Sequence, residues 1–549
     1  MASDADIAFP KLTDPHIAAL TRLGRAREVA AGEVLFAEGD RDFCFFVVLE
    51  GLVEIVEHSS GEPRTVTVHE PREFTGDVDM LSGRSALVTA RMQTGGHVLA
   101  LGAEALRKAV SELPELGETL LKAFLTRRAL LIQEGFEGIK IIGSRFSPDA
   151  HRLRDFANRN AIPFTWLDLE TDAQAEALLR HFGIPASATP VVIGRQGQLL
   201  TNPTVAELGH CVGLDADLNP DDVYDLVVVG AGPAGLAASV YAASEGLRVV
   251  TLDAIAAGGQ AGTSSRIENY LGFPTGISGA ELTANATLQA QKFGASITVP
   301  RTVVGLRAEG GERTVVLEDG STLRSRCVIV ATGVDYRRLD VQELNDFRGT
   351  GVYYAATDME ARFCKGEDVV IVGGGNSAGQ AIVYLSRYAR RVHVVLRAND
   401  LAKSMSRYLI ARVEQLPNVQ IHHNAQITSL DGDGRLTCVR IRLADGTEES
   451  VATTALFLFI GAVPRTGWLR GGVHLDKHGF LVTGHALTPE TLASERWRAA
   501  GRAPFFLETS VPGVFGAGDA RSGSVKRVAS AVGEGSMAVS FVHAHIGSL

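Results

Sequence analysis

The sequence has little cysteine, and the cysteines it has are scattered. Only five of the 549 residues are cysteine. No two of them are close enough for a Cys-x-x-Cys pair or for the ligand spacing of a zinc site. We therefore expect inert thiols in a reducing compartment, and no metal site. The five are Cys44, Cys211, Cys327, Cys364 and Cys438.

The sequence also lacks an excess of basic charge and any long hydrophobic run. Lys and Arg number 53 against 63 Asp and Glu, a net charge of −10, whereas a nucleic-acid binder needs a basic face. The longest apolar run, near Ala455 to Val463, is far short of the ~20 residues of a membrane span. The first residues carry neither the basic nor the apolar stretch of a secretory signal. We expect a cytoplasmic protein that binds no nucleic acid and spans no membrane.

What the sequence does have is length and glycine. At roughly 150 residues per domain, a chain of 549 residues predicts three or four domains. Hydrophobic residues make up 45% and charged residues 21%, which is the composition of folded globular domains. The 59 glycines follow no collagen-like period, so we expect tight turns and glycine-rich cofactor loops.

The first 135 residues read as short strands followed by helix. Glycines separate brief β-rich runs at Val34 to Phe36, Phe45 to Leu49 and Leu52 to Val56. From Glu104 to about Ile132 leucines and valines recur at helical spacing. This pattern predicts a small antiparallel barrel or β jelly roll followed by helix.

In residues 137 to 212 strands and helices alternate before a final pair of strands, an order of elements that suits a small α/β layer domain. A polar stretch at 215 to 222 then predicts a linker, and from Tyr224 strands alternate with glycine-rich turns and helices, the doubly wound α/β pattern. The elements expected in the small domain are strands at Ile139 to Ile142, Phe164 to Leu167 and Val191 to Ile193, and helices at His151 to Arg159 and Ala173 to His181.

A dinucleotide-binding loop of GxGxxG form begins at Gly230. A buried strand runs into it, and a helix follows. Gly230 permits the tight turn, Gly232 lets the backbone approach a diphosphate, and Gly235 lets the helix pack on the strand. The next strand ends in Asp253, where a carboxylate can bind ribose hydroxyls. In this context the pattern predicts a Rossmann-type site rather than a structural turn.

A second loop of the same kind follows the strand that begins at Asp368. It reads Gly373-Gly-Gly375-Asn-Ser-Ala378, and its second strand ends in Arg397 instead of an acid. An arginine suits the 2′-phosphate of NADP, whereas an acid suits NAD. Lys403 and Arg407 are either helpers at this phosphate or ordinary surface charges. Two such folds, one with an acid and one with an arginine, indicate FAD plus NADPH and a hydride passed between them.

Further motifs stand in a fixed order: Gly258-Gly-Gln260, Ile267-Glu-Asn269-Tyr, Ala331-Thr332-Gly333, Gly513 to Asp519, and Arg527-Val528-Ala529. With both loops, these make residues 222 to 549 resemble the low-molecular-weight thioredoxin reductase family, homodimers whose nicotinamide domain is inserted within the FAD domain. The resemblance implies FAD at Gly230, Gly232, Pro233, Ala234, Gly235, Asp253, Gly259, Gln260, Asn269, Ala331, Thr332, Gly333, Gly518, Asp519, Arg527, Val528 and Ala529. It implies NADPH at Gly373, Gly375, Asn376, Ser377, Ala378 and Arg397.

One departure from the family changes the chemistry. The family's redox Cys-x-x-Cys precedes the NADPH loop, and in this chain Ala355 and Asp358 occupy the two positions. Neither forms a thiolate, so we assign no catalytic residue. Cys364 is expected to be buried and structural, although Cys211 and Cys364 could meet in space.

The two preceding segments carry weaker resemblances. Residues 137 to 212 resemble a thioredoxin fold, with Thr189-Pro190 at the position of its cis-proline, but the loop at 143 to 147 has no redox cysteine. Residues 10 to 135 resemble the cyclic nucleotide-binding family, whose phosphate cassette would be Gly76, Asp77, Arg84 and Ser85. Asp77 replaces the family's Glu and the loop is shorter, so a nucleotide sensor and an empty docking domain both stay open.

The sequence therefore predicts a multidomain oxidoreductase: a cyclic-nucleotide-binding-like jelly roll plus helices at 10–135, a thioredoxin-like domain at 137–212, an FAD domain at 222–337 and 463–549, and an NADPH domain at 338–462. Hydride passes from NADPH to FAD and on to an unidentified small-molecule or carrier-protein acceptor: oxygen, a quinone, a one-electron carrier or an external disulfide. Regulation of this electron flow by a cyclic nucleotide is the open possibility that the N-terminal domain adds. Two alternatives stay open, a thioredoxin-disulfide reductase acting on an external disulfide and a slow-turnover signalling protein that senses the flavin or a bound nucleotide.

Overall fold

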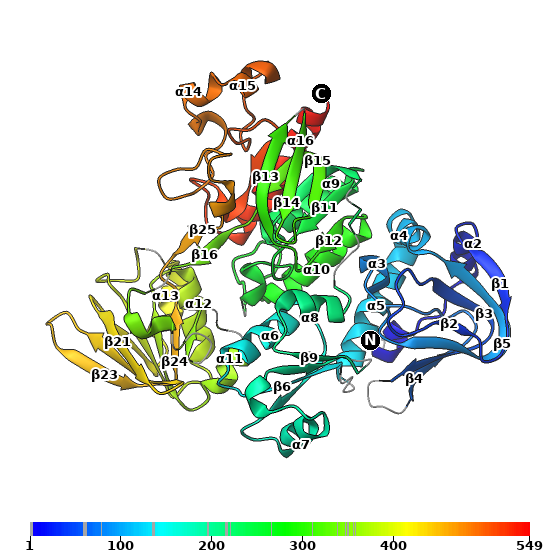
Figure 1. The fold of residues 1–549 in the computed structure, drawn as a ribbon, viewed down its shortest axis with the longest axis horizontal. Helices are drawn as coiled ribbons and strands as arrows, with labels where there is room; N and C mark the ends of the chain where they lie inside the picture. The colour runs from blue at the N-terminus through cyan, green and yellow to red at the C-terminus, as the bar shows by residue number, and fades with distance from the viewer. Residues whose placement is uncertain are drawn as a thin grey trace.

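The computed structural model describes residues 4–548 except 59–62, 78, 134–137, 195–196, 215–217, 220, 265, 310, 338, 346, 348–350, 355, 357 and 404. We call residues 4–133 the N-terminal unit and 138–214 the middle unit. Residues 223–336 and 462–548 together form the large unit, and residues 352–458 form the inserted unit. In Figure 1 the middle unit lies centrally, with the N-terminal unit on one side of it and the inserted unit on the other.

The N-terminal unit is an antiparallel sheet covered by helices. Its strands follow the order β1-β5-β3-β4, with β2 on β5, and Phe45, Phe74 and Phe124 meet in its core. Its elements are α1 (Asp4–Ala8), α2 (Asp14–Thr21), β1 (Arg25–Val29), β2 (Val34–Phe36), β3 (Phe45–Glu57), β4 (Arg64–His69), α3 (Asp79–Ser82), β5 (Thr89–Leu101), α4 (Ala103–Glu112) and α5 (Pro114–Gln133).

Two expectations for this unit are wrong in detail. The runs predicted as separate strands around Gly51 form one strand, β3, because Gly51 takes a positive φ of 89° and absorbs a register shift without ending the pairing. The single predicted helix is two, α4 and α5. The break falls at Pro114, whose ring is tolerated only in a first helical turn.

The middle unit has a four-stranded sheet in the order β7-β6-β8-β9, with β6 and β7 parallel and the other pairs antiparallel. The Thr189–Pro190 peptide is cis. Half of the linker expected at 215–222 lies outside the described residues. The elements are β6 (Ile139–Gly143), α6 (Pro148–Arg159), β7 (Phe164–Asp168), α7 (Ala173–His181), η1 (Ala186–Ala188), β8 (Val191–Ile193), β9 (Leu199–Thr201) and α8 (Val205–Cys211).

The large unit contains a seven-stranded sheet, β12-β11-β10-β15-β14-β13, with β26 also paired to β15. β10 is buried over its last four residues, the pattern of a parallel strand covered on both faces. The elements before the insertion are β10 (Val223–Val229), α9 (Pro233–Ser244), β11 (Val249–Leu252), η2 (Ala261–Thr263), α10 (Gly279–Lys292), β12 (Ser296–Thr298), β13 (Val303–Glu309), β14 (Glu312–Leu317), β15 (Thr322–Val330) and β16 (Val334–Tyr336).

The chain returns to the large unit at β25, which pairs with β16. This two-stranded link joins the large unit to the inserted unit. The returning elements are β25 (Ala462–Pro464), η4 (Gly467–Leu469), η5 (Gly484–Ala486), α14 (Pro489–Leu492), α15 (Glu495–Ala500), β26 (Val514–Gly516), η6 (Gly518–Ala520) and α16 (Val528–Ile546).

The inserted unit, preceded by η3 (Gln342–Asn345), repeats the strand–loop–helix plan around a parallel sheet, β17-β24-β18-β19-β20, and adds a second sheet, β21-β22-β23. Its elements are β17 (Val352–Tyr353), α11 (Asp358–Phe363), β18 (Asp368–Val372), α12 (Asn376–Leu385), β19 (Arg391–Val395), α13 (Arg407–Glu414), β20 (Val419–His422), β21 (Gln426–Gly432), β22 (Leu436–Arg442), β23 (Glu448–Ala452) and β24 (Ala455–Leu458).

The units are packed against one another. Leu288 of α10 packs on the core of the N-terminal unit, and Ile255 of the large unit packs on the core of the middle unit. None of the helices formed by the described residues is long and apolar enough to cross a membrane.

Candidate functional site

A cavity of about 1400 Å³ opens where the large, middle and inserted units meet. It exceeds the roughly 300–1,000 Å³ of most small-molecule sites, so it has room for an extended ligand. Both glycine loops reach it, through Gly232 of the first and Asn376 and Ser377 of the second.

The first loop is built for close backbone contact. A Cβ on Gly230, which has φ 105°, would lie 2.3 Å from the carbonyl oxygen of Ala331, and one on Gly235 would lie 1.8 Å from that of Gly230. Neither position accepts a side chain. Gly232 is the N-cap of α9, so the amides of the first helical turn point toward the cavity, as an anion site requires.

Asp253 holds this loop in shape. Its Oδ2 accepts a hydrogen bond from the amide of Ala231 at 2.9 Å, and its Oδ1 accepts from the amides of Ile255 and Ala256 at 2.9 and 3.1 Å. The carboxylate lines the cavity. It therefore orients the dinucleotide loop as well as facing the space where the sequence predicts a ribose.

Three polar groups in the cavity are suited to a ligand that is polar along its length. The buried hydroxyl of Thr332 has no hydrogen-bond partner among the described residues. Burial raises the pKa of Asp519 above its usual range and lowers the pKa of Lys526. With the N-termini of α9 and α16 facing the same space, this donor set fits a dinucleotide such as FAD.

Most residues assigned to FAD from the sequence come together here. All of them line the cavity except Gly230, Gly235 and Ala529; the first two lie behind the loop, where they shape it. Gln260 also donates through Nε2 to the carbonyl of Val334, next to the link between the units.

The second loop repeats the first in the inserted unit. Gly373 has φ 135°, and a Cβ on it would lie 2.3 Å from the carbonyl oxygen of Phe459. Gly375 is the N-cap of α12, and Asn376 Oδ1 accepts from the amide of Ser406 at 2.7 Å. Arg397 is exposed beyond the end of β19, outside the cavity lining. Such an open site suits the adenosine end of a nicotinamide dinucleotide.

The two positions that hold the redox cysteines in the family are only partly described in this structure. Ala355 lies outside the described residues, and Asp358 begins α11 with its side chain not described. All five cysteines are free, so Cys211 and Cys364 form no disulfide. Burial raises the pKa of both Cys327 and Cys364 to about 12, which makes these thiols unreactive.

The sequence did not anticipate that the middle unit would form a wall of this cavity. Helix α6 lines it from Pro148 to Arg159, and the His151 ring lies 6.0 Å from that of Tyr353 in the inserted unit. Burial lowers the pKa of His151. No spacing in the sequence relates α6 to the glycine loops, since the contact is made only by tertiary packing.

The expected nucleotide cassette lies against the middle unit. Arg84 Nη1 donates to the carbonyl of Asn160 at 3.5 Å and lies 4.0 Å from Asp79, while a Cβ on Gly213 would lie 2.7 Å from the hydroxyl of Ser85. Asp77 pairs with Arg128 at 3.4 Å, and burial raises its pKa to about 6. Gly76 accepts a hydrogen bond from Arg127 through its carbonyl.

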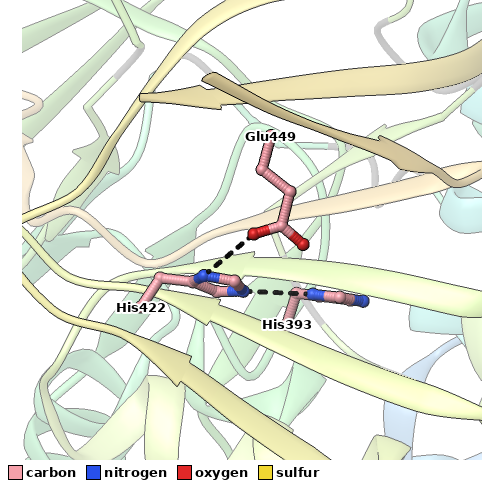
Figure 2. A group of neighbouring side chains, drawn as sticks. All are labelled: His393, His422 and Glu449. Carbon is pink, nitrogen blue, oxygen red and sulfur yellow. Dashed lines mark hydrogen bonds and ion pairs between the residues drawn. The ribbon is translucent and has the colours of Figure 1, made fainter. Parts of the chain in front are cut away.

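A second polar cluster, of residue types that can ligate a metal ion, lies between the two sheets of the inserted unit (Figure 2). His422 stands between Glu449, 3.6 Å from its Nδ1, and His393, whose Nδ1 is 3.1 Å from its Nε2. The ring centroids are 5.4 Å apart and nearly coplanar, so the nitrogens face head-on. Two zinc–nitrogen bonds of about 2.0–2.1 Å do not fit between them, and this arrangement is a hydrogen-bonded pair.

Comparison with known proteins identifies two parts of the chain. Residues 224–535 match the pyridine nucleotide-disulphide oxidoreductase family, and residues 26–112 match the cyclic nucleotide-binding domain family. A thioredoxin reductase of Mycolicibacterium smegmatis is 33% identical over 314 residues, which cover 57% of this chain and 93% of that protein. One of Streptomyces clavuligerus is 32% identical over 316 residues, which cover 57% and 91%.

Comparison with solved structures gives the same result, a similarity to thioredoxin reductases. The thioredoxin reductase of T. acidophilum superposes with a TM-score of 0.52 at 31% identity, covering 58% of this chain and 98% of that one. That of Lactococcus lactis shares the fold, with a TM-score of 0.53 at 23% identity over 59% of this chain and 100% of that one. The chain belongs to the pyridine nucleotide-disulphide oxidoreductase family, as a NAD(P)H-dependent flavoprotein oxidoreductase similar to thioredoxin reductases that use FAD and NADPH, and it also carries a cyclic nucleotide-binding domain.

Proposed function

We propose that the protein reduces FAD with NADPH and delivers the electrons to an acceptor other than a disulfide of its own. The observation that supports this most directly is that both glycine loops open into one cavity, in a chain without a Cys-x-x-Cys pair. When bound, the two cofactors supply hydride transfer. The residues of the chain supply position: the α9 turn for the flavin diphosphate and the α12 turn for the nicotinamide dinucleotide.

An acceptor screen tests this proposal. Purified protein is reduced with NADPH without oxygen and then mixed separately with oxygen, a quinone, a one-electron carrier and oxidised thioredoxin. We expect fast reoxidation by at least one of the first three and none by thioredoxin above a flavin-free control. Rapid thioredoxin reduction would favour the external-disulfide alternative, and no reoxidation by any acceptor would favour a signalling role.

We propose the following division of labour. Residues 222–337 and 463–549 bind FAD and residues 338–462 bind NADPH. Residues 137–212 form a thioredoxin-like domain without redox chemistry, since a fold without its site does not carry the function. Residues 10–135 form a jelly-roll domain of the cyclic nucleotide-binding kind. We also expect a homodimer, which light scattering would test.

We propose, further, that a cyclic nucleotide at Gly76, Asp77, Arg84 and Ser85 regulates the enzyme through the middle unit. The support is that Arg84 and Ser85 already touch Asn160 and Gly213, so a phosphate drawn to Arg84 would compete with that contact. Cyclic AMP and cyclic GMP should each be titrated while flavin reduction is followed. We expect one of them to change the rate in the unmutated protein and not in Arg84→Ala. Binding of neither nucleotide would leave the cassette as a docking surface only.

A further inference from the structure

Helix α6 is fixed to the large unit at its C-terminal end. Arg159 Nη2 donates to the carbonyl of Gly259 at 3.2 Å, and Asn160 Nδ2 donates to the carbonyl of Ile255 at 3.0 Å. Ile255 itself packs on the hydrophobic core of the middle unit. Polar and apolar contacts together hold this end of the helix over the segment that follows Asp253.

Gly259, to which Arg159 is bonded, lies against the first glycine loop. A Cβ on Gly259 would lie 2.8 Å from the Cα of Gly232, and Gly232 caps α9. Arg159 lines the cavity, and its side chain is 21% exposed. Gly259 alone therefore lies between this guanidinium and the N-terminus of α9, which faces the space predicted for the diphosphate.

The large unit contributes few cations at this place. Helix α9 contains no charged residue. Arg465, Lys526 and Arg527 also line the cavity, but Arg465 is paired with Asp335 at 2.6 Å. The Lys526 ammonium already donates to the carbonyl of Asp519 and the hydroxyl of Ser524. The amides of a helix N-terminus carry only partial positive charge, so a diphosphate at the α9 turn also needs nearby cations.

Arg159 has donors to offer. A guanidinium carries five N–H groups in a planar fork. Arg159 donates one of them to the carbonyl of Gly259, and its Nη1 lies 3.9 Å from the Asp155 carboxylate, beyond hydrogen-bond distance. Arg152, on the same helix and the same cavity wall, is different. It donates to Asp149, Asn202 and the carbonyl of Pro203 at 3.0–3.2 Å, all within the middle unit.

We propose that Arg159 is part of the FAD site and binds the cofactor's diphosphate. The middle unit then serves to complete the flavin site from outside the FAD domain, although it has no redox cysteine. This inference rests on the proposed position of FAD at the α9 turn.

The test compares two flavins on apoprotein made from the full chain. FAD carries the diphosphate and riboflavin carries none, so loss of a phosphate contact affects only FAD. In Arg159→Ala we expect the Kd for FAD to rise about ten- to a hundredfold, the range for a hydrogen bond to a charged group, with the riboflavin Kd unchanged. Arg159→Lys keeps the charge without the fork and should lie between Arg159→Ala and the unmutated protein.

Matched controls make the result decisive. Arg180→Ala removes a 76% exposed arginine from α7 of the same unit and should leave both Kd values unchanged. An unchanged FAD Kd in Arg159→Ala, an equal loss of both flavins, or an Arg159→Lys variant no better than Arg159→Ala would each overturn the inference. If the unmutated protein itself fails to bind FAD, the proposed function fails instead.

Discussion

At the residue scale, arginines make many of the polar contacts between units. Arg84 and Arg128 donate to the carbonyls of Asn160 and Ala161 at the end of α6, and Arg159 donates to Gly259. A planar guanidinium can bond several acceptors at once while keeping its charge. These arginines therefore add polar contacts to the apolar packing that Leu288 and Ile255 make between units.

Arg397 determines coenzyme preference if it contacts the 2′-phosphate. It is exposed at the end of β19, so replacing it should leave the fold intact. We expect NADPH to reduce the flavin about ten- to a hundredfold faster than NADH at subsaturating coenzyme, and Arg397→Ala to remove most of that preference, since a charged hydrogen bond contributes about 1.5–3 kcal/mol. Stopped-flow absorbance of the flavin measures both rates. Equal rates in the unmutated protein would mean that Arg397 is only a surface charge.

His69 makes the N-terminal unit sensitive to acid. Its ring is 2% exposed, lies 5.8 Å from Phe9 and contacts Glu73 at 3.4 Å. Burial lowers its pKa from 6.5 to about 4, against the opposing effect of Glu73. The unfolded chain therefore binds a proton between pH 6.5 and 4 that the folded unit does not, and stability falls as pH falls through this window, by up to about 3 kcal/mol.

Thermal unfolding at about pH 5 and about pH 7, on either side of the usual histidine pKa, checks this prediction. The transition of the N-terminal unit should occur at lower temperature in the more acidic buffer, and the difference should shrink in His69→Gln, which cannot titrate there. A pH dependence of the same size in His69→Gln would assign it to other groups.

At the element scale, α9 and α16 approach each other closely through glycine. A Cβ on Gly535 of α16 would lie 2.0 Å from the carbonyl oxygen of Ala234 in α9, whereas one on Gly533 would have nothing within 4 Å. Ala234 lines the cavity. The same contact thus holds the helix pair together and positions the start of α9, directly after the first glycine loop.

These two glycines provide a matched pair. Gly535→Ala should destabilise the large unit by about 1–3 kcal/mol, because backbone must move, and should weaken flavin retention. Gly533→Ala, in the same helix, should stabilise it by about 0.5–1 kcal/mol through helix propensity. Unfolding midpoints and flavin release on heating give both values. Equal effects of the two changes would contradict the close-packing account.

Sequence patterns predicted individual elements better than the contacts between them. The strand–glycine–helix–acid order located the first loop, and the similar order ending in an arginine located the second, because each depends on residues close together in the chain. Gly51 and Pro114 misled the prediction because a glycine can bend a strand without ending it and a proline can begin a second helix. The α6 wall was missed because nothing local to Arg159 refers to Gly259, far along the chain.

At the scale of the whole molecule, the number of electrons taken up per FAD shows whether any thiol pair takes part in the redox reaction. The two buried cysteines, Cys327 and Cys364, have pKa values raised to about 12, and none of the five is paired. We expect anaerobic titration to take up two electrons per FAD, with none of the further two that a redox disulfide accepts.

A variant with all five cysteines replaced by Ser or Ala checks this result independently. It should keep nearly the full rate of flavin reduction by NADPH, provided that its circular dichroism matches the parent. Uptake of four electrons, or slow flavin reduction in the well-folded variant, would reveal a hidden thiol pair.

The interruption of the large unit has a consequence for the growing chain on the ribosome. β15 pairs with β26 at Val328 to Val330, but the chain must first complete the whole inserted unit. At about 5–20 residues per second, that edge of β15 waits on the order of ten to forty seconds for its partner. Val328, Ile329 and Val330 are fully buried once folded. During synthesis this apolar edge is therefore open to other chains and to chaperones, and the cavity proposed for the flavin is complete only after the segment around Asp519 and Arg527 has been made.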